Sequence, residues 1–62
     1  MLQLKYHFDE PGYCRVYYRS VTRPRRLYCK QEEAPNVYVW YSCTSDGEPD
    51  YPIDADTIEI IQ

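Results

Sequence analysis

The chain contains no long hydrophobic run. Its longest uninterrupted apolar stretch, residues 37–41, is five residues long, whereas a helix that spans a membrane needs about 20. We therefore expect no membrane association. No apolar leader follows Met1, so we expect a soluble protein that resides in the cytoplasm.

Glycine and histidine are almost absent, and this excludes most catalytic motifs. Phosphate-binding loops and serine nucleophile elbows need several glycines at fixed spacing, and the chain has two glycines in 62 residues. The single histidine, His7, shares no strand face with a cysteine if side chains alternate along the chain. We therefore expect that the protein is not an enzyme and that it uses no cofactor.

The three cysteines, Cys14, Cys29 and Cys43, are an odd number, so a closed set of disulfides would leave one thiol over. Their spacing contains no C-x-x-C pair, and with His7 they give only weak support for a zinc site. The acids of residues 46–56 do not match a twelve-residue calcium loop. The sequence thus predicts free thiols, a reducing compartment and no metal.

Apolar and polar residues alternate with a period of two, which is typical of short strands. The pattern predicts strands over residues 2–8, 13–19, 26–31, 37–44 and 57–61, with loops over 9–12, 20–25, 32–36 and 45–52. A short helix is the alternative for the last segment. We predict one all-β domain over residues 1–62, an antiparallel sheet of about five strands that forms an SH3-like, partly open barrel or a curled meander.

Eight tyrosines and one tryptophan are more than so small a core can contain. Alternation predicts that Leu4, Tyr6 and Phe8 share the core face of the first strand. It predicts that Tyr18 faces the core from the second strand, while a second set of aromatic and basic side chains faces solvent. Tyr, Trp and Arg are enriched at the hot spots of protein interfaces, the few residues that contribute most of the binding energy. The predicted partner-binding set is Tyr13, Arg15, Tyr17, Arg19, Arg26, Tyr28, Tyr38 and Trp40. An aromatic cage for a methylated lysine is a variant that uses Tyr28, Tyr38 and Trp40.

Charge is distributed unevenly along the chain. Residues 1–30 hold all seven basic side chains and two acids, whereas residues 31–62 hold eight acids and no base. One interpretation is that the two halves pair and neutralise each other. The other is two surfaces, a basic aromatic patch on the second to fourth strands and an acidic patch of Asp46, Glu48, Asp50, Asp54 and Asp56.

Three classes of function are compatible with these patterns. The first is a protein-binding module: an adaptor, or a small inhibitor of a larger enzyme or complex, such as a phage-encoded inhibitor of host defence whose acids imitate nucleic acid. The second is a β-barrel that binds single-stranded nucleic acid through its Tyr and Arg side chains. The third is a homodimer or an accessory subunit of a larger assembly. The expected partner is another protein first, and nucleic acid or a second copy of the chain next.

Overall fold

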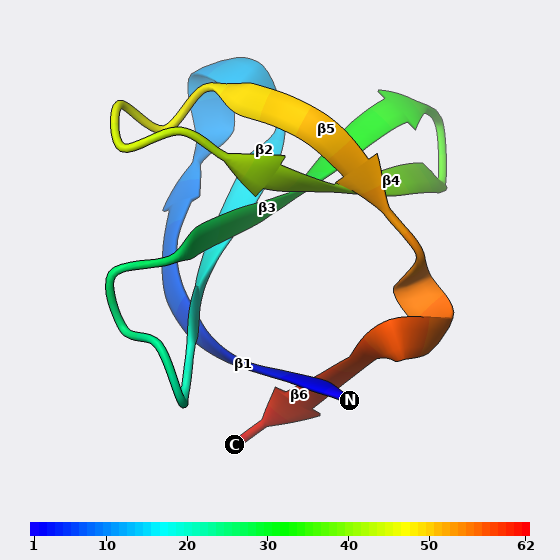
Figure 1. Ribbon diagram of the computed structural model, residues 1–62. Helices are drawn as coiled ribbons and strands as arrows, with labels where there is room; N and C mark the ends of the chain where they lie inside the picture. Colours follow the sequence, from blue (N-terminus) through cyan, green and yellow to red (C-terminus); the bar gives the residue numbers. More distant parts are fainter.

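The computed structural model describes residues 1–62 as a single curved sheet of six strands (Figure 1). The strands are β1 (Leu2–Glu10), β2 (Arg15–Ser20), β3 (Leu27–Ala34), β4 (Val37–Cys43), β5 (Pro49–Ile53) and β6 (Ile58–Ile61), and two single-turn 3-10 helices are η1 (Pro11–Tyr13) and η2 (Ala55–Thr57). The order in the sheet is β5-β4-β3-β2-β1-β6, so β5 and β6 are its free edges. The all-β prediction is confirmed, with six strands rather than five.

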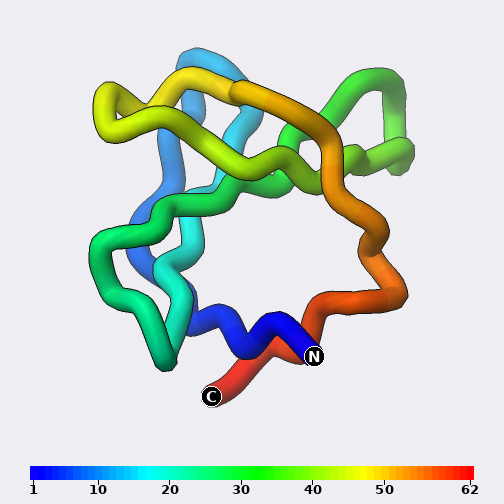
Figure 2. The backbone as a smooth tube through the Cα atoms, viewed as in Figure 1, coloured from blue at the N-terminus to red at the C-terminus, as the bar shows by residue number.

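The first and last strands lie side by side, which brings both ends of the chain to one side of the molecule (Figure 2). β6 pairs with β1 in parallel, with Leu2 opposite Ile58 and Lys5 opposite Ile61, while every other neighbouring pair is antiparallel. The last segment is therefore a strand, as the β-branched residues predict. No helix in the structure has the length and apolar character that crossing a membrane would require.

The predicted loop over residues 45–52 is wrong in its second half, because β5 forms there. Pro49 and Pro52 lie in this strand. A proline has no N–H to donate, so it disrupts a central strand, which is hydrogen-bonded to a neighbour on each side. An edge strand has a neighbour on one side only and tolerates proline. β5 therefore accepts both prolines.

An irregularity in β1 changes which face each side chain occupies. Tyr6 lies opposite Tyr18, but Phe8 lies opposite Tyr17, because the register shifts between Tyr6 and Phe8. Tyr17 and Tyr18 are successive residues of a strand and point to opposite faces. The prediction that Tyr6 and Phe8 share one face is therefore wrong.

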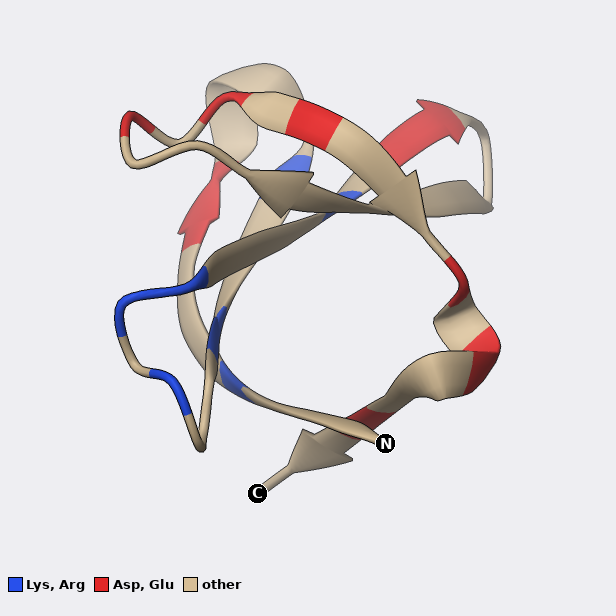
Figure 3. Ribbon diagram, viewed as in Figure 1, with Lys and Arg blue, Asp and Glu red and all other residues tan.

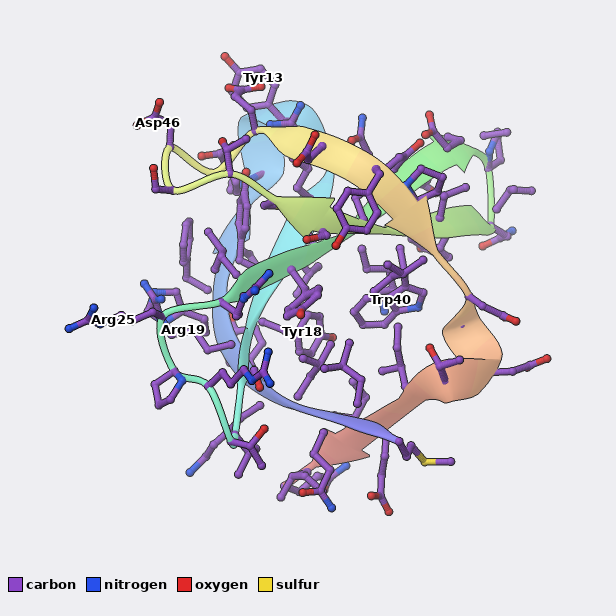
Figure 4. All side chains as sticks on the ribbon, in the orientation of Figure 1. Tyr13, Tyr18, Arg19, Arg25, Trp40 and Asp46 are labelled. Atoms are coloured by element: carbon purple, nitrogen blue, oxygen red, sulfur yellow. The ribbon has the colours of Figure 1, made fainter.

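The face that carries Tyr18 lines the inside of the curve. Leu4 and Ser20 are buried there beside Tyr18, and the Tyr18 and Trp40 rings lie 5.0 Å apart between centroids. Figure 4 shows both rings in the space that the ribbon surrounds. Trp40, predicted to face solvent, is half-buried in this cluster.

The opposite face carries a second buried cluster around Tyr17. Its ring stacks on Phe8 with centroids 4.7 Å apart, and Cys29 opposite it in β3 is fully buried. The Tyr17 hydroxyl donates to the Gly47 carbonyl at 2.7 Å, so the β4–β5 loop closes over the ring. Tyr17 is 2% exposed. Its prediction as a surface anchor is wrong, because the curled sheet packs both of its faces.

Candidate functional site

The predicted partner-binding set does not form one surface. Strand register places Tyr28, Tyr38 and Trp40 on the Tyr18 face, whereas Arg15 and Arg19 share the Tyr17 face. Among the eight members, Tyr13, Arg26 and Tyr38 are exposed, Tyr17 is buried, and the rest are half-buried: Arg15, Arg19, Tyr28 and Trp40. A partner has full access only to the first three.

Two exposed tyrosines lie at one end of the sheet, where the β1–β2 turn meets the β3–β4 hairpin. Tyr13 is 63% exposed and Tyr38 is 50% exposed. The Glu32 N–H donates to the Cys14 carbonyl at 3.1 Å, and Glu32 lies opposite Tyr38, so this bond holds the two regions together. We call Tyr13 and Tyr38, with Cys14 and Glu32 that link their two regions, the aromatic end.

Each tyrosine of the aromatic end has a cation over its ring. The Arg15 guanidinium carbon lies 4.8 Å from the Tyr13 centroid, and Lys30 Nζ lies 5.1 Å from that of Tyr38. Such contacts contribute about 0.5–1 kcal/mol at exposed sites. They restrict the rings in the free protein, which lowers the entropy lost when a partner covers them.

A shallow hollow of about 350 Å³ adjoins Tyr38. Its walls come from the β1–β2 turn and from the neighbouring strands: Asp9, Pro11, Cys14, Arg15, Val16, Glu32 and Tyr38. The aromatic end therefore offers both a protruding ring and a depression, the two shapes that interface anchors use.

The aromatic cage for a methylated lysine is not free. Lys30 Nζ lies 5.9 Å from the Trp40 centroid as well as over Tyr38, so the chain's own ammonium group already occupies this aromatic pair. Lys30 stands directly opposite Trp40 in the ladder between β3 and β4, which explains the contact.

Arg15 makes its contacts within the protein and is largely inaccessible to a partner. Its guanidinium lies 3.8 Å from Glu10 and 3.9 Å from Glu48, and it donates to the hydroxyl of Tyr17 at 3.4 Å. The bond to Tyr17, with the nearby Glu48 charge, raises the pKa of Arg15 further above its ordinary value. Only 11% of its side chain is exposed, so little of it is left for a partner.

Arg15 is the only basic residue in an ion pair, and Glu10 and Glu48 are the only acids in one. The interpretation in which the two halves of the chain neutralise each other is therefore wrong. The other charges are only partly segregated. In Figure 3, Lys and Arg concentrate on the β2–β3 loop and the adjoining parts of β1 and β2, with others on the upper parts of β2 and β3, while Asp and Glu lie along β5, η2 and β6 and also at the ends of β1 and β3 and in the β4–β5 loop.

Five cations form what we call the basic corner: Lys5, Arg19, Arg23, Arg25 and Arg26. Lys5 lies opposite Arg19 in the β1–β2 ladder, and the Arg19 guanidinium donates to the Pro24 carbonyl at 3.0 Å. The predicted basic aromatic patch on the second to fourth strands is thus replaced by a corner on β1, β2 and the β2–β3 loop. The run from Arg23 to Arg26 is the signal for this corner in the sequence, but Arg23 and Arg25 lie outside the predicted partner-binding set because loop residues have no strand face.

The predicted acidic patch is an arc rather than a compact cluster. Asp50 lies in β5, Asp54 caps η2 by accepting from the Asp56 N–H at 3.0 Å, and Asp56 lies within η2. Asp46 and Glu48 are in the β4–β5 loop, on the side of the Tyr17 cluster. The five acids therefore reach from the basic corner to the far side of the sheet.

The three cysteines are free thiols in different surroundings. Cys14 is exposed, Cys29 is fully buried, and Cys43 is half-buried on the same face as Cys29. Burial raises the pKa of Cys29 and raises that of Cys43 to about 12, the neighbouring Cys29 adding to the second shift. No three His, Cys, Asp or Glu side chains lie close enough to hold a metal ion.

Comparison with known proteins gives no relative: no family model, curated protein or solved structure matches the chain. The surfaces described above are therefore the basis for any functional proposal.

Proposed function

We propose that this chain is a non-enzymatic protein-binding module whose anchor is the aromatic end. The observation that carries the proposal is the exposure of Tyr13 and Tyr38 together with the cation that orders each ring. Large tyrosine side chains that are restrained before binding give contact area at low entropic cost. The hollow beside Tyr38 supports the same role, since it would receive a side chain of the partner.

The acidic arc, which consists of Asp46, Glu48, Asp50, Asp54 and Asp56, orients the proposed module on its partner. Asp50, Asp54 and Asp56 have no basic neighbour within ion-pair distance. Figure 3 shows β5 and η2 away from the β2–β3 loop, which carries most of the basic corner. Such an array attracts a basic surface and sets the docking direction more than the affinity. An inhibitor that occupies a nucleic-acid-binding groove would use the arc in this way.

Capture from a nuclease-treated lysate of the source cell tests the anchor. The double variant Tyr13→Ala/Tyr38→Ala should lose the captured protein, because each substitution removes an exposed ring. The matched control is Tyr51→Ala, since Tyr51 is 52% exposed but lies in β5, away from the aromatic end. Equal loss with both variants, or retention by the double variant, would contradict the proposed anchor.

The orientation is tested with the amide variants of Asp50, Asp54 and Asp56, measured as the association rate with the captured protein at low and high salt. We expect a slower association at low salt and little change at high salt. The control is Glu33→Gln, since Glu33 is an exposed acid of β3 that lies outside both the arc and the hollow beside Tyr38.

A further inference from the structure

The basic corner lies away from the aromatic end and has no function in the proposal above. Its loop is ordered by the chain itself: the Arg26 N–H donates to the Arg23 carbonyl at 2.9 Å, and the Arg23 N–H donates to the Ser20 hydroxyl at 3.1 Å. Ser20 is buried, so the residue that holds the start of the loop is itself fixed in position. The loop therefore presents its arginines in a defined arrangement before any ligand binds.

Four of the five cations in the corner are arginines, the residue whose planar guanidinium binds phosphate oxygens in pairs. Arg23, Arg25 and Arg26 are exposed, and none of the five has an acidic partner within ion-pair distance. Figure 4 shows Arg25 pointing away from the body of the molecule, on the same side as Arg19. A row of unneutralised arginines on an ordered loop suits a chain of phosphates.

A second hollow, of about 230 Å³, opens directly beside the corner. Arg19 forms one wall, Phe8 and Leu27 supply apolar surface, and Asp46 and Glu10 supply carboxylates. The hollow is smaller than sites for drug-sized ligands, and it combines an aromatic ring, 40% exposed, with hydrogen-bond acceptors. A single unpaired base has the size and polarity to match, whereas a phosphate would be repelled by the two acids.

We infer that the basic corner binds a single-stranded nucleic acid, with phosphates along Arg19, Arg23, Arg25 and Arg26 and one base in the hollow against Phe8. Carboxylates accept hydrogen bonds from the amino group of cytosine, so Asp46 favours cytosine over thymine. Tyr17 lines the hollow as well but is 2% exposed, and the half-buried tyrosines of the Tyr18 face lie outside this surface. Glu10 and Asp46 line the hollow and keep phosphates on the arginine side of the corner. The acids of the chain that lie farther away than about 10 Å are screened at ordinary salt.

Fluorescence anisotropy with purified protein and labelled twelve-nucleotide oligodeoxycytidine, from 50 to 200 mM salt, tests the inference. Four arginines on about four phosphates predict a slope of log affinity against log salt of about −2.8, which is about a 50-fold loss over this range. Arg23→Gln/Arg25→Gln/Arg26→Gln should reduce the slope by about 2 and weaken binding at 50 mM salt by more than about tenfold. Lys30→Gln, which removes a cation outside the corner, should leave both values unchanged.

The base site has its own test, made on the same oligonucleotides. Phe8→Leu should weaken binding about fivefold or more without changing the salt slope. The control is Tyr6→Leu, which should have no effect because Tyr6 is an exposed aromatic residue on the other face. Oligodeoxythymidine should bind more weakly than oligodeoxycytidine, and Asp46→Asn should bring the two closer together.

Three results would overturn the inference. The first is no binding at 50 mM salt, and the second is an affinity that the triple arginine variant does not change. The third is equal affinity and slope for polyglutamate, which would make the corner a surface for acidic proteins. Because the assay contains no protein partner, its failure leaves the capture experiment on Tyr13 and Tyr38 unaffected.

Discussion

The Tyr17 hydroxyl and the Gly47 carbonyl meet at 2.7 Å, although 30 residues of chain separate them. Gly47 has a φ of +85°, a backbone conformation that residues with a side chain rarely adopt. The tight turn that Gly47 permits brings the β4–β5 loop over the Tyr17 ring. One hydrogen bond thus joins the buried ring of β2 to the loop that covers it.

Tyr17→Phe tests the energetic weight of the Tyr17 hydroxyl, which donates to Gly47 and accepts from Arg15. The substitution keeps the ring stacked on Phe8 but leaves the Gly47 carbonyl without its donor, which should cost about 1–2 kcal/mol. For a domain of this size the melting temperature should fall by about 4–8 °C for each kcal/mol. Thermal unfolding followed by circular dichroism measures it. The exposed Tyr51→Phe is the control, and an equal shift in both variants would show that the bond to Gly47 carries no special weight.

Gly47→Ala tests the turn rather than the bond. A methyl group there would contact Tyr17 at ordinary distances, so the cost comes from the positive φ and should be about 1 kcal/mol or more. Gly12→Ala is the matched control, because Gly12 has open space around it and no positive φ. Urea unfolding should show a lower midpoint for the first variant only.

The thiols should react with Ellman's reagent in two classes. Cys14 is exposed and should react promptly at pH 8, whereas Cys29 and Cys43 are shielded and their raised pKa values keep them protonated. One equivalent should appear fast in the native protein and three after denaturation. Cys14→Ser should abolish the fast phase, and three fast equivalents in the native wild type would contradict the packing of the Tyr17 face.

Stability should fall at alkaline pH. Burial raises the pKa values of Tyr17, Tyr18 and Cys43 in the folded state above those in the unfolded chain. Above pH 9 the unfolded state therefore binds fewer protons than the folded state, so the free energy of unfolding decreases as pH rises from 9 to 12. Urea titrations across this range measure the slope. Cys43→Ala should reduce it and Cys14→Ser should not, while a flat profile would contradict the burial of these groups.

The sequence predicted the strands whose alternation is regular and failed where tertiary structure overrides it. The strand over residues 37–44 was predicted well, because its β-branched and aromatic residues suit a central position. β5 was missed because its two prolines indicate a loop unless the strand is known to lie at an edge. No local signal shows which strand is an edge, since that depends on the order of strands in the sheet.

The candidate site was predicted only in part, for a related reason. Alternation assigns one face to the core and one to solvent, but this sheet curls enough to bury Tyr18 on one face and Tyr17 on the other. The register shift between Tyr6 and Phe8 could not be inferred from spacing. Tyr13, Arg26 and Tyr38 remained exposed as predicted, because each lies in or beside a turn, where neighbouring strands cannot cover it.

Hydrogen exchange, measured on the protein alone and bound to the protein that it captures, tests most directly the claim that the aromatic end is the anchor. Binding there should slow exchange in residues 12–16 and 36–39 and leave β6 unchanged. Slower exchange confined to β6, or to Tyr51 and its neighbours in β5, would place the partner on a sheet edge and contradict the account.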